Sequence, residues 1–290
     1  MAEGIHPAGV VRMKLSFTKM HGAGNDFVVI DGVSQSVEIT APVIKRLADR
    51  HRGIGCDQVL LLTAPDDPDA DFRYTVFNAD GSRAGQCGNG ARCAGRFLRE
   101  KRLTRKRTLT LLTDGEPLQL SLGDDGRIFA GLAPPQFTPE AIPFKADATR
   151  HQYNIDVQGQ VLSIGAVSMG NPHAVLIVDD AHGAPVPVLG PLIESHDRFP
   201  ARTNVGFMQI LSRSEIKLRV YERGVGETEA CGSGACAAVV HGIQGNLLGS
   251  EVAVHLPGGK LSVTWAGGQE RVWLGGPTTT VFEGTININQ

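Results

Sequence analysis

Residues 74–94 read YTVFNADGSRAGQCGNGARCA, and residues 218–238 read LRVYERGVGETEACGSGACAA. The two segments align without a gap at an offset of 144 residues (231 − 87), which places Cys87 opposite Cys231. The glycines one and three positions after each cysteine align as well. A long repeat within one chain indicates a duplicated structural unit. The pattern predicts two halves of one fold, each with a cysteine before a glycine-rich helix start.

Two weaker echoes lie upstream, in the same order in each half. GIGCDQ at 53–58 resembles NVGFMQ at 204–209, and NDFVVID at 25–31 resembles NPHAVLIVD at 171–179 if one gap is allowed. A stretch rich in Pro and Ala, 134–148, is the expected crossing between the halves, and the last strand is expected to return to the first half. We therefore predict a first domain of residues 14–133 plus 277–290, a second domain of residues 134–276, and an N-terminal extension of residues 1–13.

Short runs of β-branched or alternating apolar residues predict strands, and a helix is expected after each C-G-x-G sequence, at roughly 89–102 and 233–243. Both helices carry Ala and Gly on one face, which allows the close backbone approach of a curved sheet wrapped around a helix. The predicted fold class is α+β, with two pseudo-symmetric domains and mainly antiparallel sheets. The clearest strands are expected at 27–30, 74–77, 108–112, 175–178, 217–221 and 261–265.

Composition narrows the class of protein. The chain has 290 residues, 41% of them hydrophobic, and a formal charge of −2, which suits two domains and gives no basic excess for nucleic acid. No apolar run approaches the roughly 18 residues of a membrane span, and the N-terminus lacks a secretory apolar segment. Five cysteines without zinc-like spacing predict reduced thiols in a cytoplasm, with no metal site. No pyridoxal motif is visible, so no cofactor is expected.

The repeated cysteines are expected to sit where a helix begins. A helix N-terminus carries about half a positive charge and several unpaired N–H donors. Such a site binds anions, including a substrate carboxylate, and makes a nearby thiol more acidic than its free pKa of about 8.5. Cys87 and Cys231 are therefore the candidate reactive pair, whereas Cys56, Cys93 and Cys236 have no counterparts in the repeat and are expected to be small buried hydrophobes.

Two opposed thiols suit the inversion of a stereocentre by proton transfer. One cysteine, as thiolate, removes the proton from one face of the carbon, and the other, as thiol, returns a proton to the opposite face. N–H groups from both helices would bind the α-carboxylate and stabilise the developing carbanion. The sequence thus predicts a cofactor-independent amino-acid epimerase.

From about Lys14 to its end, the sequence resembles the diaminopimelate epimerases. Seven motifs carry the resemblance, and their combination and order are more specific than any one of them. They are FTKMHGAGNDFVVID (17–31), RGIGCDQ (52–58), FNADGSRAGQCGNGARC (77–93), SMGNPH (168–173), NVGFMQ (204–209), YERGVGET (221–228) and ACGSGACA (230–237).

The resemblance implies conversion between LL- and meso-2,6-diaminopimelate, closure of two domains around the substrate in the cleft between them, and a homodimer. It implies that Cys87 acts on the LL substrate and Cys231 on the meso substrate, with His173 and Glu222 tuning the thiols. Arg223 suits the distal carboxylate of this substrate, which is charged at both ends. The implied substrate-binding residues are Asn25, Gln58, Asn78, Gly88, Asn89, Asn171, Asn204, Glu222, Arg223, Gly232 and Ser233.

Two other readings stay open at this point. A proline or hydroxyproline racemase would also use two cysteines, but its small cyclic substrate gives no role to Arg223. A redox sensor would close Cys87 and Cys231 into a disulfide. The basic run at 96–107 is expected to be a solvated helix end rather than a nucleic-acid site.

Overall fold

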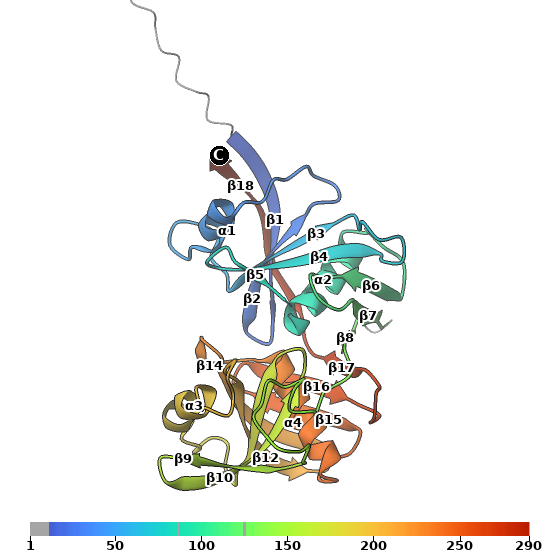
Figure 1. Cartoon of the computed structure of the whole chain (residues 1–290). Coiled ribbons are helices and arrows are strands. Elements are labelled where there is room, and N and C mark those ends of the chain that lie inside the picture. Colours follow the sequence, from blue (N-terminus) through green and yellow to red (C-terminus); the bar gives the residue numbers. More distant parts are fainter. Residues whose placement is uncertain (1–11, 86, 124–125, 290) are drawn as a thin grey trace, which may run out of the picture.

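The protein is described by a computed structural model that covers residues 12–85, 87–123 and 126–289. Its elements form two lobes, one above the other in Figure 1, and each lobe holds one long helix against curved strands. Residues 1–11 of the predicted N-terminal extension lie outside the described residues. None of the helices in the described part of the chain has the length and apolar character to cross a membrane.

The first lobe surrounds α2, whose inner face is buried against the sheet. Gly95 shows how closely they pack, because a Cβ at this position would lie 3.0 Å from side-chain atoms of both Leu120 and Leu122. The elements are β1 (Arg12–Gly22), β2 (Asn25–Asp31), α1 (Ala41–Ala48), β3 (Gln58–Thr63), β4 (Phe72–Asn78), β5 (Arg83–Ala84), α2 (Gly88–Glu100), β6 (Thr108–Leu112), β7 (Leu118–Leu122) and β8 (Ile128–Leu132).

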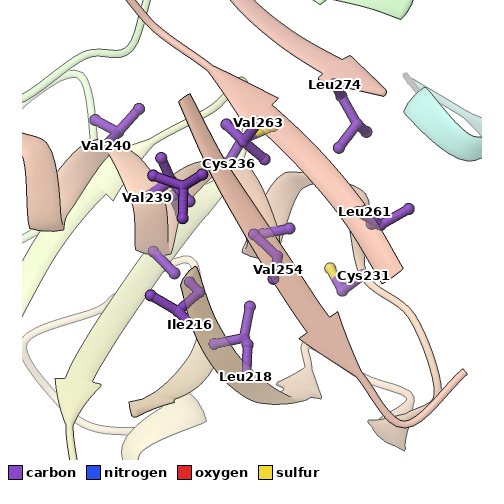
Figure 2. Close-up of a cluster of buried hydrophobic side chains, with 14 of the residues drawn as sticks. Ile216, Leu218, Cys231, Cys236, Val239, Val240, Val254, Leu261, Val263 and Leu274 are labelled. Atoms are coloured by element: carbon purple, nitrogen blue, oxygen red, sulfur yellow. The ribbon is translucent and has the colours of Figure 1, made fainter. Parts of the chain in front are cut away.

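The second lobe surrounds α4 in the same way. Figure 2 shows Cys236, Val239 and Val240 of this helix among apolar side chains of the neighbouring strands. The elements are β9 (Tyr153–Val157), β10 (Gln160–Ser168), β11 (Pro172–Ile177), α3 (Val186–Glu194), β12 (Asn204–Ser212), β13 (Glu215–Glu222), β14 (Gly226–Thr228), α4 (Gly232–Gln244), β15 (Glu251–Leu256), β16 (Gly259–Thr264) and β17 (Val272–Gly275).

Strand pairing repeats from one lobe to the other. In the first lobe β2 and β3 are parallel, β3 and β4 antiparallel, and β4 and β6 parallel. In the second lobe β11 and β12 are parallel, β12 and β13 antiparallel, and β13 and β15 parallel. The predicted α+β fold and its internal duplication are therefore confirmed.

Strand register corrects one of the predicted echoes. The parallel pairs match Phe27 with Gln58 in the first lobe and His173 with Asn204 in the second. Gln58 and Asn204, each the first residue of its strand, are therefore counterparts, and the sequence match of Gln58 with Gln209 is wrong. The residues before Gln58 form the loop preceding β3, whereas the residues before Gln209 lie inside β12. The similar glycine spacing in the two segments therefore does not reflect an equivalent position in the fold.

The six predicted strands all fall on strands of the structure, although two of them end one residue earlier than expected. Both predicted helices are present and begin one residue before the expected positions. The sequence analysis missed α1 and α3, which are short and carry Pro in their first turns. Cys56, Cys93 and Cys236 are buried, as expected.

One antiparallel strand pairing and the returning last strand connect the lobes. β17 pairs with β8, and the last strand, β18 (Thr279–Asn289), runs back along β1 so that the C-terminus lies beside the start of β1 (Figure 1). β1 starts at Arg12, which pairs with Asn289, so the regular structure begins two residues before the predicted first domain. The exact domain boundaries stay a prediction.

Candidate active site

Both repeated cysteines occupy the residue immediately before a helix. Cys87 precedes α2 with φ −134° and ψ 104°, and Cys231 precedes α4 with φ −112° and ψ 107°. This extended backbone turns each side chain toward the first helical turn, the usual geometry of a helix N-cap. Each helix follows a hairpin, β4–β5 or β13–β14, so the duplicated hairpins bring the two cysteines to equivalent places.

The Cys87 thiol lies close to the backbone N–H groups at the start of its own helix, α2. Its Sγ accepts the backbone N–H of Gly90 at 3.4 Å and lies 3.7 Å from Oδ1 of Asn25. The hydroxyl of Tyr74 donates to the Cys87 carbonyl at 3.1 Å, which fixes the backbone before the helix. The cysteine is half-buried and therefore reachable from the cleft.

Cys231 is the more enclosed of the pair, with 4% of its surface exposed. Its Sγ lies 3.7 Å from Oγ of Ser233. The neighbouring carboxylate is Glu222 at the end of β13, which also accepts the hydroxyl of Thr228. The two thiols therefore differ in surroundings although their backbones match.

Helix position alone does not make these thiols acidic, which corrects the sequence-based expectation. Burial raises the pKa of Cys87 to about 11, although the N–H of Gly90 and the charge of Arg92 act to lower it. Burial raises the pKa of Cys231 well above its ordinary value, and Glu222 raises it further. Desolvation of the sulfur outweighs the helix donors, because burial penalises the charged thiolate more than the neutral thiol.

The helix starts lie against each other across one apolar side chain. A Cβ on Gly88 or on Gly232 would stand 2.8 Å from Cδ2 of Leu274 in either case. The same position on Gly232 is 3.3 Å from Oδ1 of Asn89. Glycine at both helix starts therefore permits the two N-termini to converge, as the repeat predicted.

A single cleft of about 1450 Å³ runs between the lobes beside these helix starts. It brings together every predicted site residue except His173 and Asn204. The predicted residues that line it are Asn25, Gln58, Asn78, Cys87, Gly88, Asn89, Asn171, Glu222, Arg223, Cys231, Gly232 and Ser233.

The remaining two predicted residues lie just behind the cleft wall. Asn204 is buried and donates to the carbonyl of Pro172 at 3.1 Å, while its Oδ1 accepts the backbone N–H of Arg223 at 3.0 Å. His173 is buried, and its Nε2 lies 2.9 Å from Oδ1 of Asn171. Burial lowers the pKa of His173 to about 3, so its ring is neutral near pH 7. Asn204 and His173 therefore act on the cleft through Arg223 and Asn171, which line it.

Amide side chains form a second group in the first lobe. Nε2 of Gln58 donates to Oδ1 of Asn78 at 3.1 Å, and Nδ2 of Asn78 donates to Oγ of Ser82 at 3.1 Å. Oε1 of Gln58 is buried and has no partner among the described residues. Because buried acceptors normally find a donor, this oxygen is suited to an ammonium group of a bound ligand.

Sequence reasoning missed an ionic network at the mouth of the cleft. Arg50 donates to both Asp26 and Asp57, and Lys19 forms an ion pair with Asp26. Asp57 also accepts Nδ2 of Asn25 at 2.9 Å, so the network holds a predicted binding residue in place. Lys19 and Asp26 lie seven residues apart, as do Arg50 and Asp57, but the fold is needed to join these two pairs across 24 residues.

His21 is a further cleft residue that the sequence analysis did not single out, although it lies within the 17–31 motif. Its Nδ1 is buried without a partner among the described residues. A motif shows which residues occur together but does not show which of them face the cleft.

The sequence matches known proteins of one family. The family model described as "Diaminopimelate epimerase" matches residues 17–137 and 165–280. A protein named diaminopimelate epimerase from Pseudomonas syringae pv. tomato is 52% identical over 276 residues, covering 95% of this chain and all of that protein. One of the same name from Thioalkalivibrio sulfidiphilus is 54% identical over 278 residues, with the same coverage.

Solved structures of lower sequence similarity share the fold. A PhzF-family phenazine biosynthesis protein of Bacillus anthracis superposes with a TM-score of 0.68 at 17% identity, covering 95% of this chain and all of that chain. A hydroxyproline epimerase of Agrobacterium vitis superposes with a TM-score of 0.67 at 15% identity, covering 95% of this chain and 92% of that chain. The structural matches establish the fold alone, whereas the sequence matches establish that this chain belongs to the diaminopimelate epimerase family.

Proposed function

We propose that this protein interconverts LL- and meso-2,6-diaminopimelate without a cofactor, with Cys87 and Cys231 as the acid/base pair. The observation that carries the proposal is the presence of both helix-capping cysteines on one cleft, beside two converging helix N-termini. Family membership gives the substrate, and the repeated geometry gives the reaction type.

The proposed reaction moves one proton off the α-carbon and one proton onto it. The Cys87 thiolate takes the α-proton of the LL substrate and becomes a thiol, leaving an electron pair delocalised into the α-carboxylate. The Cys231 thiol then donates its proton to the opposite face of the carbon and becomes a thiolate. One turnover therefore leaves Cys87 as thiol and Cys231 as thiolate, and exchange of protons with solvent restores the starting state. In the reverse direction the two sulfurs exchange roles.

Backbone N–H groups at the starts of α2 and α4 supply the donors for the α-carboxylate, since Gly88 and Gly232 leave both helix ends open to the cleft. Donors that are fixed before the reaction stabilise the carbanion more effectively than water does. Asn25 and Asn171 are counterparts in the two lobes and flank this position from the starts of β2 and β11.

The far end of the cleft suits the second amino-acid group of the substrate. Arg223 is exposed at the cleft, and its Nη1 donates to the carbonyl of Ala201, which leaves other guanidinium N–H groups for a carboxylate. Oδ1 of Asn78 offers an acceptor for the distal ammonium. Recognition at both ends would select diaminopimelate over substrates with one amino-acid group.

Exchange of the α-proton with D₂O tests this proposal directly. With LL-diaminopimelate, the wild type is expected to give a meso product that carries deuterium from solvent at the inverted carbon. The variants Cys87→Ala and Cys231→Ala are each expected to lose epimerisation by several orders of magnitude. Undiminished epimerisation by either variant would rule out the two-base mechanism, and turnover of L-proline but not diaminopimelate would overturn the substrate.

Assembly and location form a second part of the proposal. We expect a cytoplasmic homodimer, and β18 offers a surface for the contact because Phe282 is exposed on it, with Phe17 packed edge-on against Phe282 at 5.9 Å. Sedimentation of the wild type should give twice the mass of one chain, and Phe282→Asp should lower that mass. Sedimentation of the wild type as a single chain would exclude the dimer.

A further inference from the structure

Arg92, in the second turn of α2, has no exposed surface. At the repeat offset of 144 residues, the counterpart of Arg92 in α4 is Cys236. The second copy of the helix therefore has no cation at this position. Its Nη2 donates to Oδ1 of Asn89 at 2.9 Å, and its Nη1 is 3.5 Å from the carbonyl of Gly88. The proposed function above makes no use of this residue.

The Arg92 guanidinium forms no ion pair with any carboxylate of the described residues. Its Nε has no hydrogen-bond partner among them either. Taking an unpaired charge out of water costs several kcal/mol in a folded protein, and an arginine keeps its charge at all ordinary pH values. A buried cation without a structural counter-ion therefore calls for a functional explanation.

Burial favours the neutral form of each titratable group that acts on Arg92. Burial raises the pKa of Cys93 and of Cys236 to about 12 and that of Tyr74 well above its ordinary value. Cys87, whose Sγ accepts the Gly90 N–H, is the remaining neighbour that acts on the Arg92 charge. The thiolate of Cys87 is thus the nearby anion that the proposed reaction itself would create.

Arg92 also fixes the amide that joins the two helix starts. Because the guanidinium holds Oδ1 of Asn89, the NH₂ end of this amide remains for the cleft that Asn89 lines. The same Oδ1 lies 3.3 Å from the position that a Cβ on Gly232 would take. The contact therefore links α2 to the first residue of α4.

We propose that Arg92 is a positioning residue that favours Cys87, rather than Cys231, as the resting thiolate and orients Asn89 toward the substrate carboxylate. This inference rests on the proposed function for its substrate but not for its effect on the thiol. Glu222 supplies the opposite bias at Cys231, because this carboxylate forms a hydrogen bond with the thiol and raises its pKa. The two charges break the symmetry of the duplicated site.

The direction of the pKa effects agrees with this geometry. Burial raises the pKa of Cys87, Gly90 N–H lowers it, Glu222 raises it and Arg92 lowers it. For Cys231 burial and Glu222 both raise the pKa. Among the described residues, the charged and titratable groups that act at the Cys87 end are Arg92 and Cys93 on α2, Glu222 on β13 and Tyr74 on β4.

The experiment measures thiol titration without substrate. Iodoacetamide alkylation at a series of pH values, followed by peptide mass spectrometry, gives an apparent pKa for Cys87 in the wild type, Arg92→Gln and Arg92→Lys. Removal of a nearby opposite charge shifts a pKa by about one unit or more. We expect Arg92→Gln to raise the apparent pKa of Cys87 by about one unit. At pH values below this pKa, alkylation of Cys87 in Arg92→Gln should be about tenfold slower than in the wild type. In Arg92→Lys, the apparent pKa of Cys87 should stay close to the wild-type value.

Arg96→Gln is the matched control, since Arg96 lies one turn further along α2, pairs with Glu100, and should leave the titration unchanged. Equal apparent pKa values for folded Arg92→Gln and Arg92→Lys would overturn the proposal. If Arg92→Gln does not fold, Arg92→Lys decides alone, because a rise of one unit with the charge retained would also contradict it. Loss of diaminopimelate turnover in the wild type would instead refute the proposed function and leave the titration result standing.

Discussion

Gly88 and Gly232 begin the two duplicated helices and face the same atom, since a Cβ on either would lie 2.8 Å from Cδ2 of Leu274. Leu274 is completely buried in β17, the strand that pairs with β8 of the other lobe. One side chain therefore sets how closely the two helix N-termini approach, and that separation determines whether both can reach one carboxylate.

Replacement of Gly232 by Ala should displace Leu274 and move the start of α4. We expect a loss of stability of about 1–3 kcal/mol from overpacking and a fall in kcat/KM of about tenfold or more. A double-mutant cycle with Leu274→Ala measures the coupling, because a smaller side chain at 274 makes room for the new methyl group. Strict additivity of the two changes in unfolding free energy would show that Leu274 does not limit this approach.

Asn204→Ala should weaken both folding and substrate binding. The substitution leaves the Arg223 N–H and the Pro172 carbonyl without their buried partner, which costs on the order of 2 kcal/mol. Substrate KM should rise about tenfold because Arg223 loses its anchor. Asn78→Ala provides the comparison, since Asn78 lines the cleft directly and should change KM with little effect on unfolding in urea. Wild-type stability of Asn204→Ala would contradict the placement of this residue behind the cleft.

The protein should lose stability in acid as Asp26 becomes protonated. Burial acts to raise the pKa of Asp26, but hydrogen bonds from Arg50 and Lys19 outweigh it and hold the pKa well below its ordinary value. A carboxyl group with a depressed folded-state pKa stabilises the fold above the unfolded pKa of about 4 and loses this contribution as the pH falls through the folded value. The contribution near pH 7 is on the order of 2 kcal/mol.

Denaturant unfolding from pH 7 to pH 3 tests this expectation. The stability difference between wild type and Asp26→Asn should be largest near pH 7 and shrink below about pH 4. Asp66→Asn is the control, because Asp66 belongs to an exposed ion pair with Arg73, and such pairs contribute little. A wild-type advantage that stays constant down to pH 3 would exclude the proposed ionic contribution.

Mild oxidation should inactivate the enzyme reversibly. Cys87 and Cys231 are free thiols on one cleft, so closure of the lobes without substrate could bring the sulfurs together as a disulfide. Activity should fall with the loss of two titratable thiols and return with dithiothreitol, whereas substrate should protect. Cys93→Ala, at a fully buried position, should behave as the wild type. Full activity after oxidation, or no recovery with dithiothreitol, would refute the idea.

The gap-free repeat around Cys87 and Cys231 was sufficient to predict the duplicated fold, because glycine spacing at a helix start is a local property of the chain. Local spacing did not identify the counterpart of Gln58, because a loop in one half and a strand in the other have similar sequences. The strand register, which pairs Phe27 with Gln58 and His173 with Asn204, shows that Asn204 is the counterpart. The helices α1 and α3 were missed because each is short and carries Pro in its first turn, although the buried residues Val43, Ile44 and Leu47 of α1 do follow helical spacing.

By itself the sequence was enough to identify the pair of repeated cysteines, the glycine-rich helix starts that follow them, and the family. The tertiary structure decided which residues line the cleft, placed Asn204 and His173 behind it, and buried the charge of Arg92 within α2. It also showed that burial raises the thiol pKa values against the helix donors. These outcomes depend on desolvation and on contacts between residues far apart in the chain, which local sequence patterns do not encode.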